Sequence, residues 1–129
     1  AAYEFVCTHP NLPEDLIPYW DFDAVNIPHE LRDASAAAIM AAALYELSMY
    51  SNKAKYKETA DKVMHSLSSS DYRSKIGENH NFLLMHSVGS YPHGSEIDVP
   101  LIYADYYFLE ALKRKRDCDI EAKSKSVQK

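Results

Sequence analysis

The feature that most constrains this fold is an apolar segment that begins at Asp98-Val99-Pro100 and runs to Leu112. An Asp followed shortly by Pro predicts the start of a helix, because the carboxylate caps free backbone N–H groups and Pro has no N–H that would stay unpaired. Apolar residues then recur at helical spacing on more than one face. A helix that is apolar over most of its circumference must pack between other elements. We therefore expect this helix to lie inside a helical assembly.

The loop that precedes this helix, residues 86–97, is rich in small polar side chains. It holds two of the three glycines of the chain, Gly89 and Gly94. Between and around them lie four polar side chains, which are His86, Ser90, His93 and Ser95. Such a loop beside the N-terminus of a buried helix suits an anionic or polyhydroxyl ligand.

Three further helical segments are predicted upstream. Tyr3 to Cys7 has the pattern of a last helical turn, a second helix opens at Asp33-Ala34-Ser35 and runs to about Ser51, and a third spans roughly Lys53 to Ser69. Alanine fills most of the second helix, which favours helix formation and lets neighbouring helices approach closely. The third is an ordinary amphipathic helix. Residues 8–33 form a long irregular connection with four prolines, and it contains the sequence PYWDFD.

These segments predict an all-α fold. The sequence has no stretch of strand periodicity and no hairpin signal. Two of the helices are apolar nearly all round, so they require partners that this chain does not supply. We interpret the chain as one sector of a larger toroid of helices, not as a complete domain.

Charge is spread unevenly along the 129 residues. Residues 113–129 hold half of all Lys and Arg, but carboxylates interrupt them and no aromatic residues are interleaved. This pattern favours a solvated helix end running into a disordered basic tail over residues 117–129, and it argues against a nucleic-acid partner. No apolar run is long enough to span a membrane. Cys7 and Cys118 are expected to be free thiols.

The six histidines lack metal-ligand spacing, so the sequence predicts no metal site and no cofactor.

Three blocks in order resemble one known family. They are PYWDFD, then RDASAAAI at 32–39, then LLMHSVGSYPHGSEIDVPLIYADYYFLEAL. The series resembles the C-terminal third of the unsaturated glucuronyl hydrolases, glycoside hydrolase family 88, over residues 1–116. The resemblance implies the last helices of an (α/α)6 barrel. The related unsaturated rhamnogalacturonyl hydrolases of family 105 share that barrel and are the nearest competing assignment.

The resemblance also implies a reaction. Family members release a 4,5-unsaturated uronic acid from the non-reducing end of lyase-generated oligosaccharides, by protonating the C4=C5 bond and adding water. Their catalytic aspartates lie in earlier helices, and no residue here matches them, so we expect no catalytic residue and no activity in this chain alone. Its partners would be the unsaturated oligosaccharide and the missing N-terminal helices of the same barrel. The implied source is a bacterium, with a cytoplasmic or a periplasmic location left open.

The alternative is a different class of function, a truncated helical module that binds a glycan or a partner protein without catalysis. The sequence favours the hydrolase, because the helices are too apolar to stay uncovered.

Binding residues follow from the resemblance. Some family members carry a Ser-x-x-Ser-x-Lys pattern for sulfated sugars in the loop before the last helix. Here Ser90 matches, His93 replaces the second Ser and Ser95 replaces the Lys. Losing the Lys removes a positive charge, which argues against a strong preference for that sulfate pattern, although a protonated His93 could still donate to a carboxylate or a sulfate.

Three further candidates for substrate binding are His86, Trp20 and Arg32. Each has a structural alternative. His86 can be a satisfied structural histidine, Trp20 can pack within the proline-rich connection, and Arg32 can join Asp33 in a capping and ion-pair arrangement.

Overall fold

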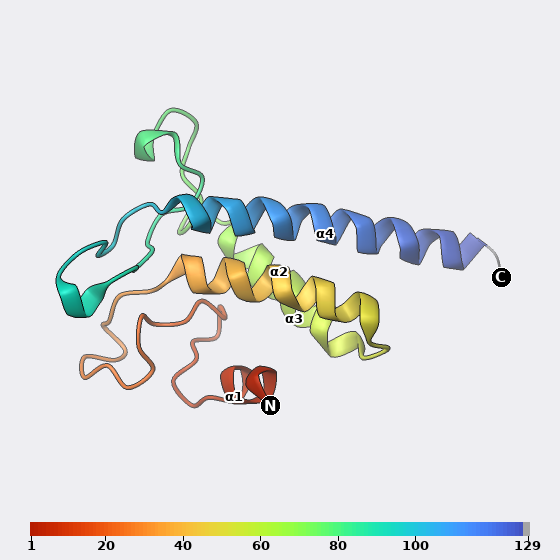
Figure 1. Ribbon diagram of the computed structural model, residues 1–129, viewed down its shortest axis with the longest axis horizontal. Coiled ribbons are helices and arrows are strands. Elements are labelled where there is room, and N and C mark those ends of the chain that lie inside the picture. The colour runs from red at the N-terminus through yellow and green to blue at the C-terminus, as the bar shows by residue number, and fades with distance from the viewer. Residues whose placement is uncertain (128–129) are drawn as a thin grey trace.

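A computed structural model describes residues 1–127 of the chain (Figure 1). Its regular elements are all helical, and no β-strand forms within these residues. The four α-helices are α1 (Ala2–Cys7), α2 (Ala34–Tyr50), α3 (Ala54–Leu67) and α4 (Ile102–Val127), and the two short 3-10 turns are η1 (Asn79–Asn81) and η2 (Tyr91–His93). The predicted all-α class and the helices expected at 33–51 and 53–69 are confirmed.

Helices α2 and α4 lie side by side and run in the same direction, while α3 packs against α2 and runs back (Figure 1). Both α2 and α4 therefore begin at the same end of the molecule. The long connection of residues 8–33 and the loop before α4 gather at this end. Because a helix N-terminus carries a partial positive charge, two such charges point toward these loops.

Helix α2 is capped by a side chain at its start and packs through small side chains along its buried face. Its Asp33 N-cap accepts hydrogen bonds from the Ser35 backbone N–H at 3.0 Å and from the Ser35 hydroxyl at 2.6 Å. Alanines fill the buried face of α2 and form one apolar core with larger side chains such as Tyr45 and Phe108.

Helix α4 begins later than the sequence predicts. Asp98 was expected to cap it, but α4 starts only at Ile102. The Asp98 carboxylate instead lies 2.7 Å from Nδ1 of His86, and its backbone has a φ of +51°. The capping prediction is therefore wrong, because the histidine competes for the carboxylate.

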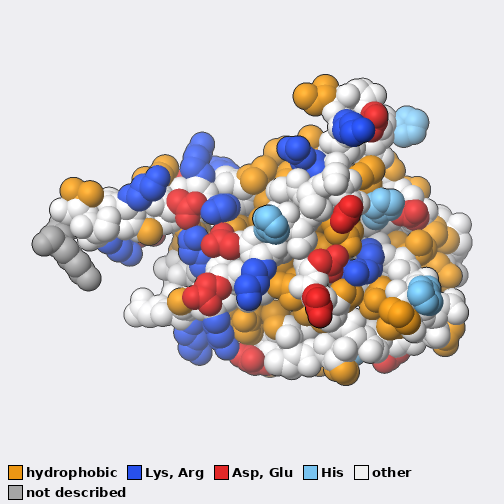
Figure 2. All heavy atoms as spheres, turned by 180° about the vertical axis from the view of Figure 1, so that it is seen from behind, with side chains coloured by type: hydrophobic (Ala, Val, Ile, Leu, Met, Phe, Trp, Pro, Cys, Tyr) orange, Lys and Arg blue, Asp and Glu red, His pale blue; other side chains and the backbone are white. Residues whose placement is uncertain are grey.

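Helix α4 also ends later than expected. The sequence predicts disorder over residues 117–129, whereas α4 continues to Val127, and residues 128–129 lie outside the described range. Cys118 is buried there, and ion pairs one helical turn apart join Lys113 to Asp117 and Lys115 to Asp119. On the face in Figure 2, basic and acidic side chains lie next to one another toward the end of α4.

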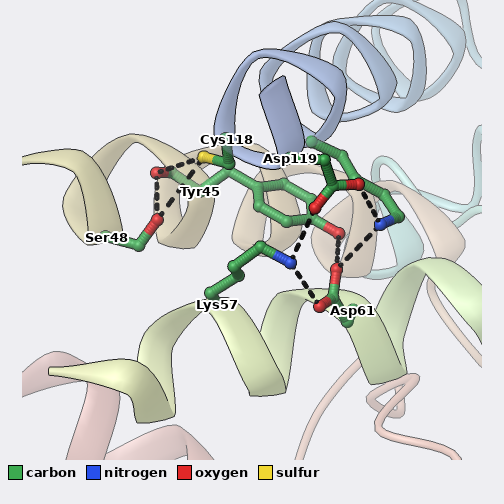
Figure 3. A network of polar contacts seen from close by, with 7 residues as sticks. Tyr45, Ser48, Lys57, Asp61, Cys118 and Asp119 are labelled. Atoms are coloured by element: carbon green, nitrogen blue, oxygen red, sulfur yellow. Dashed lines mark hydrogen bonds and ion pairs between the residues drawn. The ribbon is translucent and has the colours of Figure 1, made fainter. Parts of the chain in front are cut away.

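A polar network ties this end of α4 to the other helices (Figure 3). The Tyr45 hydroxyl donates to Asp61 at 2.6 Å, and Lys57 bridges Asp61 at 2.8 Å and Asp119 at 3.0 Å. Burial would raise the pKa of Asp61, but hydrogen bonds from Lys57 and Tyr45 hold it below its usual value. Burial of the Tyr45 hydroxyl and its hydrogen bond to the Asp61 carboxylate raise the pKa of Tyr45. The network holds Asp119 of α4 beside Lys57 of α3, and residues 121–127 continue the helix beyond it with exposed side chains.

The outer face of α4 stays apolar and exposed. Ile102, Tyr106 and Leu109 are 73%, 60% and 53% exposed, while Ala104, Phe108 and Ala111 on the opposite face are buried. Residues 1–127 cover only one face of α4, which agrees with the expectation that this helix needs partners that the chain does not supply.

Within residues 1–127, no helix is both long and apolar enough to cross a membrane. In the same part of the chain, His, Cys, Asp and Glu side chains form no group of three or more that could hold a metal ion. Cys7 and Cys118 are free thiols, as predicted.

Candidate functional site

The candidate site lies where α2 and α4 begin. Asp33 connects the two loops there, because its carboxylate caps α2 and also accepts a hydrogen bond from the Val88 backbone N–H at 3.3 Å. The Ala34 N–H donates to the His86 carbonyl at 2.9 Å. The first turn of α2 thus fixes the start of the loop before α4.

That loop folds back on itself as a short hairpin-like turn. Ser87 and Val99 exchange backbone hydrogen bonds of 3.1 and 3.0 Å, and the Gly89 N–H donates to the Glu96 carbonyl at 2.8 Å. A Cβ atom at Gly89 would overlap the exposed Glu96 side chain, which would have to move. We call residues 86–99 the hairpin loop.

Three predicted binding residues lie together at the tip of the hairpin loop. The Ser90 hydroxyl lies 2.9 Å from Nδ1 of His93, and the Ser95 N–H donates to the Ser90 carbonyl at 3.3 Å. The side chains of His93 and Ser95 are exposed. If the Ser90 hydroxyl donates to Nδ1, the Nε2–H of His93 remains free to donate to a ligand.

Trp20 joins this group through an aromatic neighbour that the sequence reasoning missed. Its ring stacks on Tyr91, with centroids 4.0 Å apart and planes 17° from parallel. Its indole N–H is buried and donates to no atom within residues 1–127. Trp20 and Tyr91 are far apart in sequence, so no local pattern could have paired them.

Arg32 and His86 form a second group. Together with Asp71, Tyr72 and Asp98 they line a cavity of about 200 Å³. The His86 side chain pairs with Asp98 at 2.7 Å, which agrees with the structural role considered for it and leaves its other ring nitrogen uncommitted.

The Arg32 guanidinium is committed to the protein. It pairs with Asp15 at 2.8 Å, donates to the Ile17 carbonyl and lies 4.8 Å above the Tyr19 ring. Its ion pair is therefore with Asp15, whereas Asp33 does the capping.

Asp15 is the centre of this group, and the sequence reasoning missed it. Burial would raise the pKa of its carboxyl, but hydrogen bonds from Arg32, from the Ile17 N–H and from Tyr72 at 2.8 Å hold that pKa below its usual value. Burial and the bond to Asp15 raise the pKa of Tyr72. The contacts of Asp15 with Arg32, Ile17 and Tyr72 thus hold residues 15–19 and residue 32 together next to this cavity.

Sequence comparisons identify relatives of the chain. No protein-family model matches it. The curated unsaturated glucuronyl hydrolase of Formosa agariphila is 49% identical over 117 residues, which are 91% of this chain and 29% of the relative. An unsaturated chondroitin disaccharide hydrolase of Streptococcus pyogenes is 36% identical over 107 residues, which are 80% of this chain and 27% of that protein.

Solved structures agree. The crystal structure of an unsaturated glucuronyl hydrolase specific for heparin matches 91% of this chain and 32% of its own, with 49% identity and a TM-score of 0.88. The enzyme of Bacillus sp. GL1, described as responsible for glycosaminoglycan degradation, matches 88% of this chain and 30% of its own, with 28% identity and a TM-score of 0.76. The helices described here therefore form part of the (α/α)6 barrel of these proteins.

The chain spans about 30% of the length of the proteins it matches, and nearly all of it is included in the match. The order of its three sequence blocks, the shared backbone and the 49% identity all point to the same group of proteins. By sequence and by fold, the chain belongs to the unsaturated glucuronyl hydrolase family.

Proposed function

We propose that this chain forms part of a glycoside hydrolase that releases a 4,5-unsaturated uronic acid from the non-reducing end of lyase-generated oligosaccharides. The observation that carries the proposal is the agreement with the heparin-specific hydrolase, 49% identity and a TM-score of 0.88 over 91% of the chain. The reaction is a hydration of the C4=C5 bond. A proton adds to C4 and water adds to C5, and the resulting hemiketal opens and releases the rest of the sugar.

The proposed role of the hairpin loop is to contact the sugar beyond the scissile bond. Ser90 and His93 would present one hydroxyl and one ring N–H to that sugar. Ser95 stands where some relatives have Lys, and the exposed carboxylates of Glu96 and Asp98 lie in the same loop. This charge balance favours an unsulfated sugar over a sulfated one. This preference would differ from that of a relative from Streptococcus agalactiae, 32% identical, which is described as complexed with the sulfated disaccharide dGlcA-GalNAc6S.

The remaining helices of the barrel are the proposed protein partner of this chain. They would cover the apolar face of α4 at Ile102, Tyr106 and Leu109. The chain alone would be inactive, since no residue in it matches the catalytic aspartates of the family. A non-catalytic glycan-binding module is the alternative that the following experiment separates.

The test is a hybrid protein, in which this chain replaces the matching segment of the heparin-specific hydrolase, to which it is 49% identical. Turnover is followed as the loss of the ultraviolet absorbance of the C4=C5 bond conjugated to the carboxylate. We expect the hybrid to hydrolyse an unsulfated unsaturated heparin disaccharide, and the isolated chain to leave it unchanged.

Two controls make the result decisive. The unaltered relative gives the reference rate, and circular dichroism establishes that the hybrid is folded. A folded hybrid with no turnover on unsaturated heparin or chondroitin disaccharides would overturn the proposal and support the non-catalytic alternative.

A further inference from the structure

A second cavity lies beside the hairpin loop and has no part in the proposed reaction. It measures about 350 Å³ and opens between α1, residues 18–22 and the first turns of α2. Trp20 forms one of its walls and at the same time stacks on Tyr91 of the hairpin loop. A volume of this size is at the lower end of the range for small-ligand sites.

Its walls combine apolar and aromatic side chains. Val6 from α1 and Met40 from α2 contribute aliphatic surface, and Trp20 and Phe22 contribute rings. The Phe22 ring is itself held by stacking on His9, with centroids 4.3 Å apart and planes 14° from parallel. Both rings are thus fixed by aromatic neighbours, so a ligand would meet a wall that is already ordered.

The charged groups of this cavity are carboxylates. Asp21 and Asp33 line it, and no Lys, Arg or His is among its lining residues within the described chain. Asp33 is engaged in capping α2. Asp21 is exposed, and its Oδ1 accepts the Asp23 N–H at 2.9 Å, which leaves its Oδ2 able to accept from a ligand hydroxyl.

From this chemistry we propose that the cavity is a subsite for a neutral sugar ring, a hexose or an N-acetylhexosamine within a longer oligosaccharide. Aromatic and aliphatic walls pack against the C–H face of a sugar, and Asp21 accepts its hydroxyl protons. The same carboxylate repels a uronate or a sulfate, because like charges in a partly enclosed site are unfavourable. The assignment of the ligand as a sugar rests on the proposed function.

The position of the cavity suits a sugar that follows the one held by the hairpin loop. The Trp20–Tyr91 stack joins the cavity to the tip of the hairpin loop, where Ser90 and His93 would hold the sugar next to the cleaved bond. An oligosaccharide whose next unit is neutral would place that unit in the cavity, whereas the uronate that follows the amino sugar in a glycosaminoglycan chain would be disfavoured there. The subsite would therefore select among longer substrates and leave a disaccharide unaffected.

Trp20 is the single tryptophan of the chain, so all tryptophan emission comes from the wall of this cavity and its stack on Tyr91. We would titrate the purified chain with chitotetraose as the neutral probe and with saturated tetragalacturonate as the anionic probe. We expect a saturable change in Trp20 emission with chitotetraose, and at least about tenfold weaker binding of tetragalacturonate, which corresponds to about 1.4 kcal/mol.

A charge-neutral variant tests the role of the carboxylate. Asp21→Asn keeps the size of the side chain and removes its charge, so the discrimination between the two probes should fall by about threefold or more. Asp71→Asn is the matched control, because Asp71 lines the other cavity with Arg32 and His86. That variant should leave both titrations unchanged.

Several results would overturn the subsite. They are no emission change with chitotetraose, equal or tighter binding of tetragalacturonate, or an equal effect of Asp71→Asn and Asp21→Asn. The titration needs no catalysis, so its failure is separate from that of the proposed function. If the hybrid shows no turnover but the chain still binds chitotetraose, the proposed function is overturned and the cavity is still supported as a glycan-binding site.

Discussion

At the scale of single residues, the pair of Arg32 and Asp15 fixes the connection of residues 8–33 next to the candidate site. The two side chains are 26% and 33% exposed, so solvent screens them less than it screens the Lys113–Asp117 pair, at 63% and 41%. Asp15 also accepts the Tyr72 hydroxyl, so one carboxylate fixes the 15–19 segment to the chain that follows α3. Arg32 is thereby a positioning residue in this structure.

Removing this guanidinium should destabilise the chain. We expect Arg32→Ala to lower the free energy of unfolding by about 1–3 kcal/mol, because Asp15 loses its charge partner while it remains partly buried. Lys113→Ala is the matched surface control and should change it by less than about 0.5 kcal/mol. Urea unfolding measures both, and equal losses in the two variants would contradict this role for Arg32.

The same carboxylate should make stability depend on pH. The pKa of Asp15 is lower in the folded chain than its usual value of about 3.9. The folded state therefore holds the proton less tightly, so the stabilisation is complete above about pH 5 and is lost as the pH falls through the folded pKa.

An Asp15→Asn variant isolates this contribution from those of Asp61 and Asp119, whose pKa values are also lowered. We expect the difference in unfolding free energy between the unaltered chain and the variant to shrink between pH 5 and pH 3, which are working limits set around the usual Asp pKa of about 3.9. A difference that stays constant over this range would show that Asp15 carries no such linkage.

At the scale of elements, the sequence predicted the helices better than their ends. The Asp33 cap and the alanines of α2 act locally, so local reasoning found them. The start of α4 was missed where His86 takes the Asp98 carboxylate, and the ordered helix around residues 117–119 was missed because Lys57 on α3 reaches Asp119. Both errors come from contacts between residues far apart in sequence.

The candidate site also has one part that the sequence predicts and one part that only the tertiary fold produces. Ser90, His93 and Ser95 were predicted as a group, and they lie on one turn, so their proximity follows from their spacing. The stacking of Trp20 on Tyr91 depends on the tertiary fold and has no local signal.

The hairpin loop offers a direct test of its own packing. Gly89→Ala places a methyl group against the Glu96 side chain, so the loop must shift. We expect a loss of up to about 1 kcal/mol in unfolding free energy, because the exposed Glu96 side chain can give way, and a change in Trp20 fluorescence through the Tyr91 stack.

The double variant Gly89→Ala with Glu96→Ala removes the overlapping atoms. It should restore the fluorescence of the unaltered chain. If the double variant keeps the altered emission, the contact with Glu96 is not what requires the glycine.

At the scale of the whole molecule, the chain has a core of its own and an apolar face that this core does not use. Tyr45, Leu67 and Phe108 belong to the buried cluster, whereas Tyr106 and Leu109 point outward from α4. An exposed apolar stripe on a buried-type helix marks a surface that another element covers. The match to about a third of a barrel supports the proposal that the other helices of that barrel cover this face.

The measurement that tests this account most directly is sedimentation of the purified chain over a range of concentrations. We predict self-association that grows with concentration, because the uncovered face of α4 finds copies of itself. A variant with Tyr106→Glu and Leu109→Lys should stay monomeric and keep its helical circular dichroism. If the unaltered chain sediments as a monomer at every concentration, its apolar face needs no cover, and the account of this chain as one sector of a barrel is contradicted.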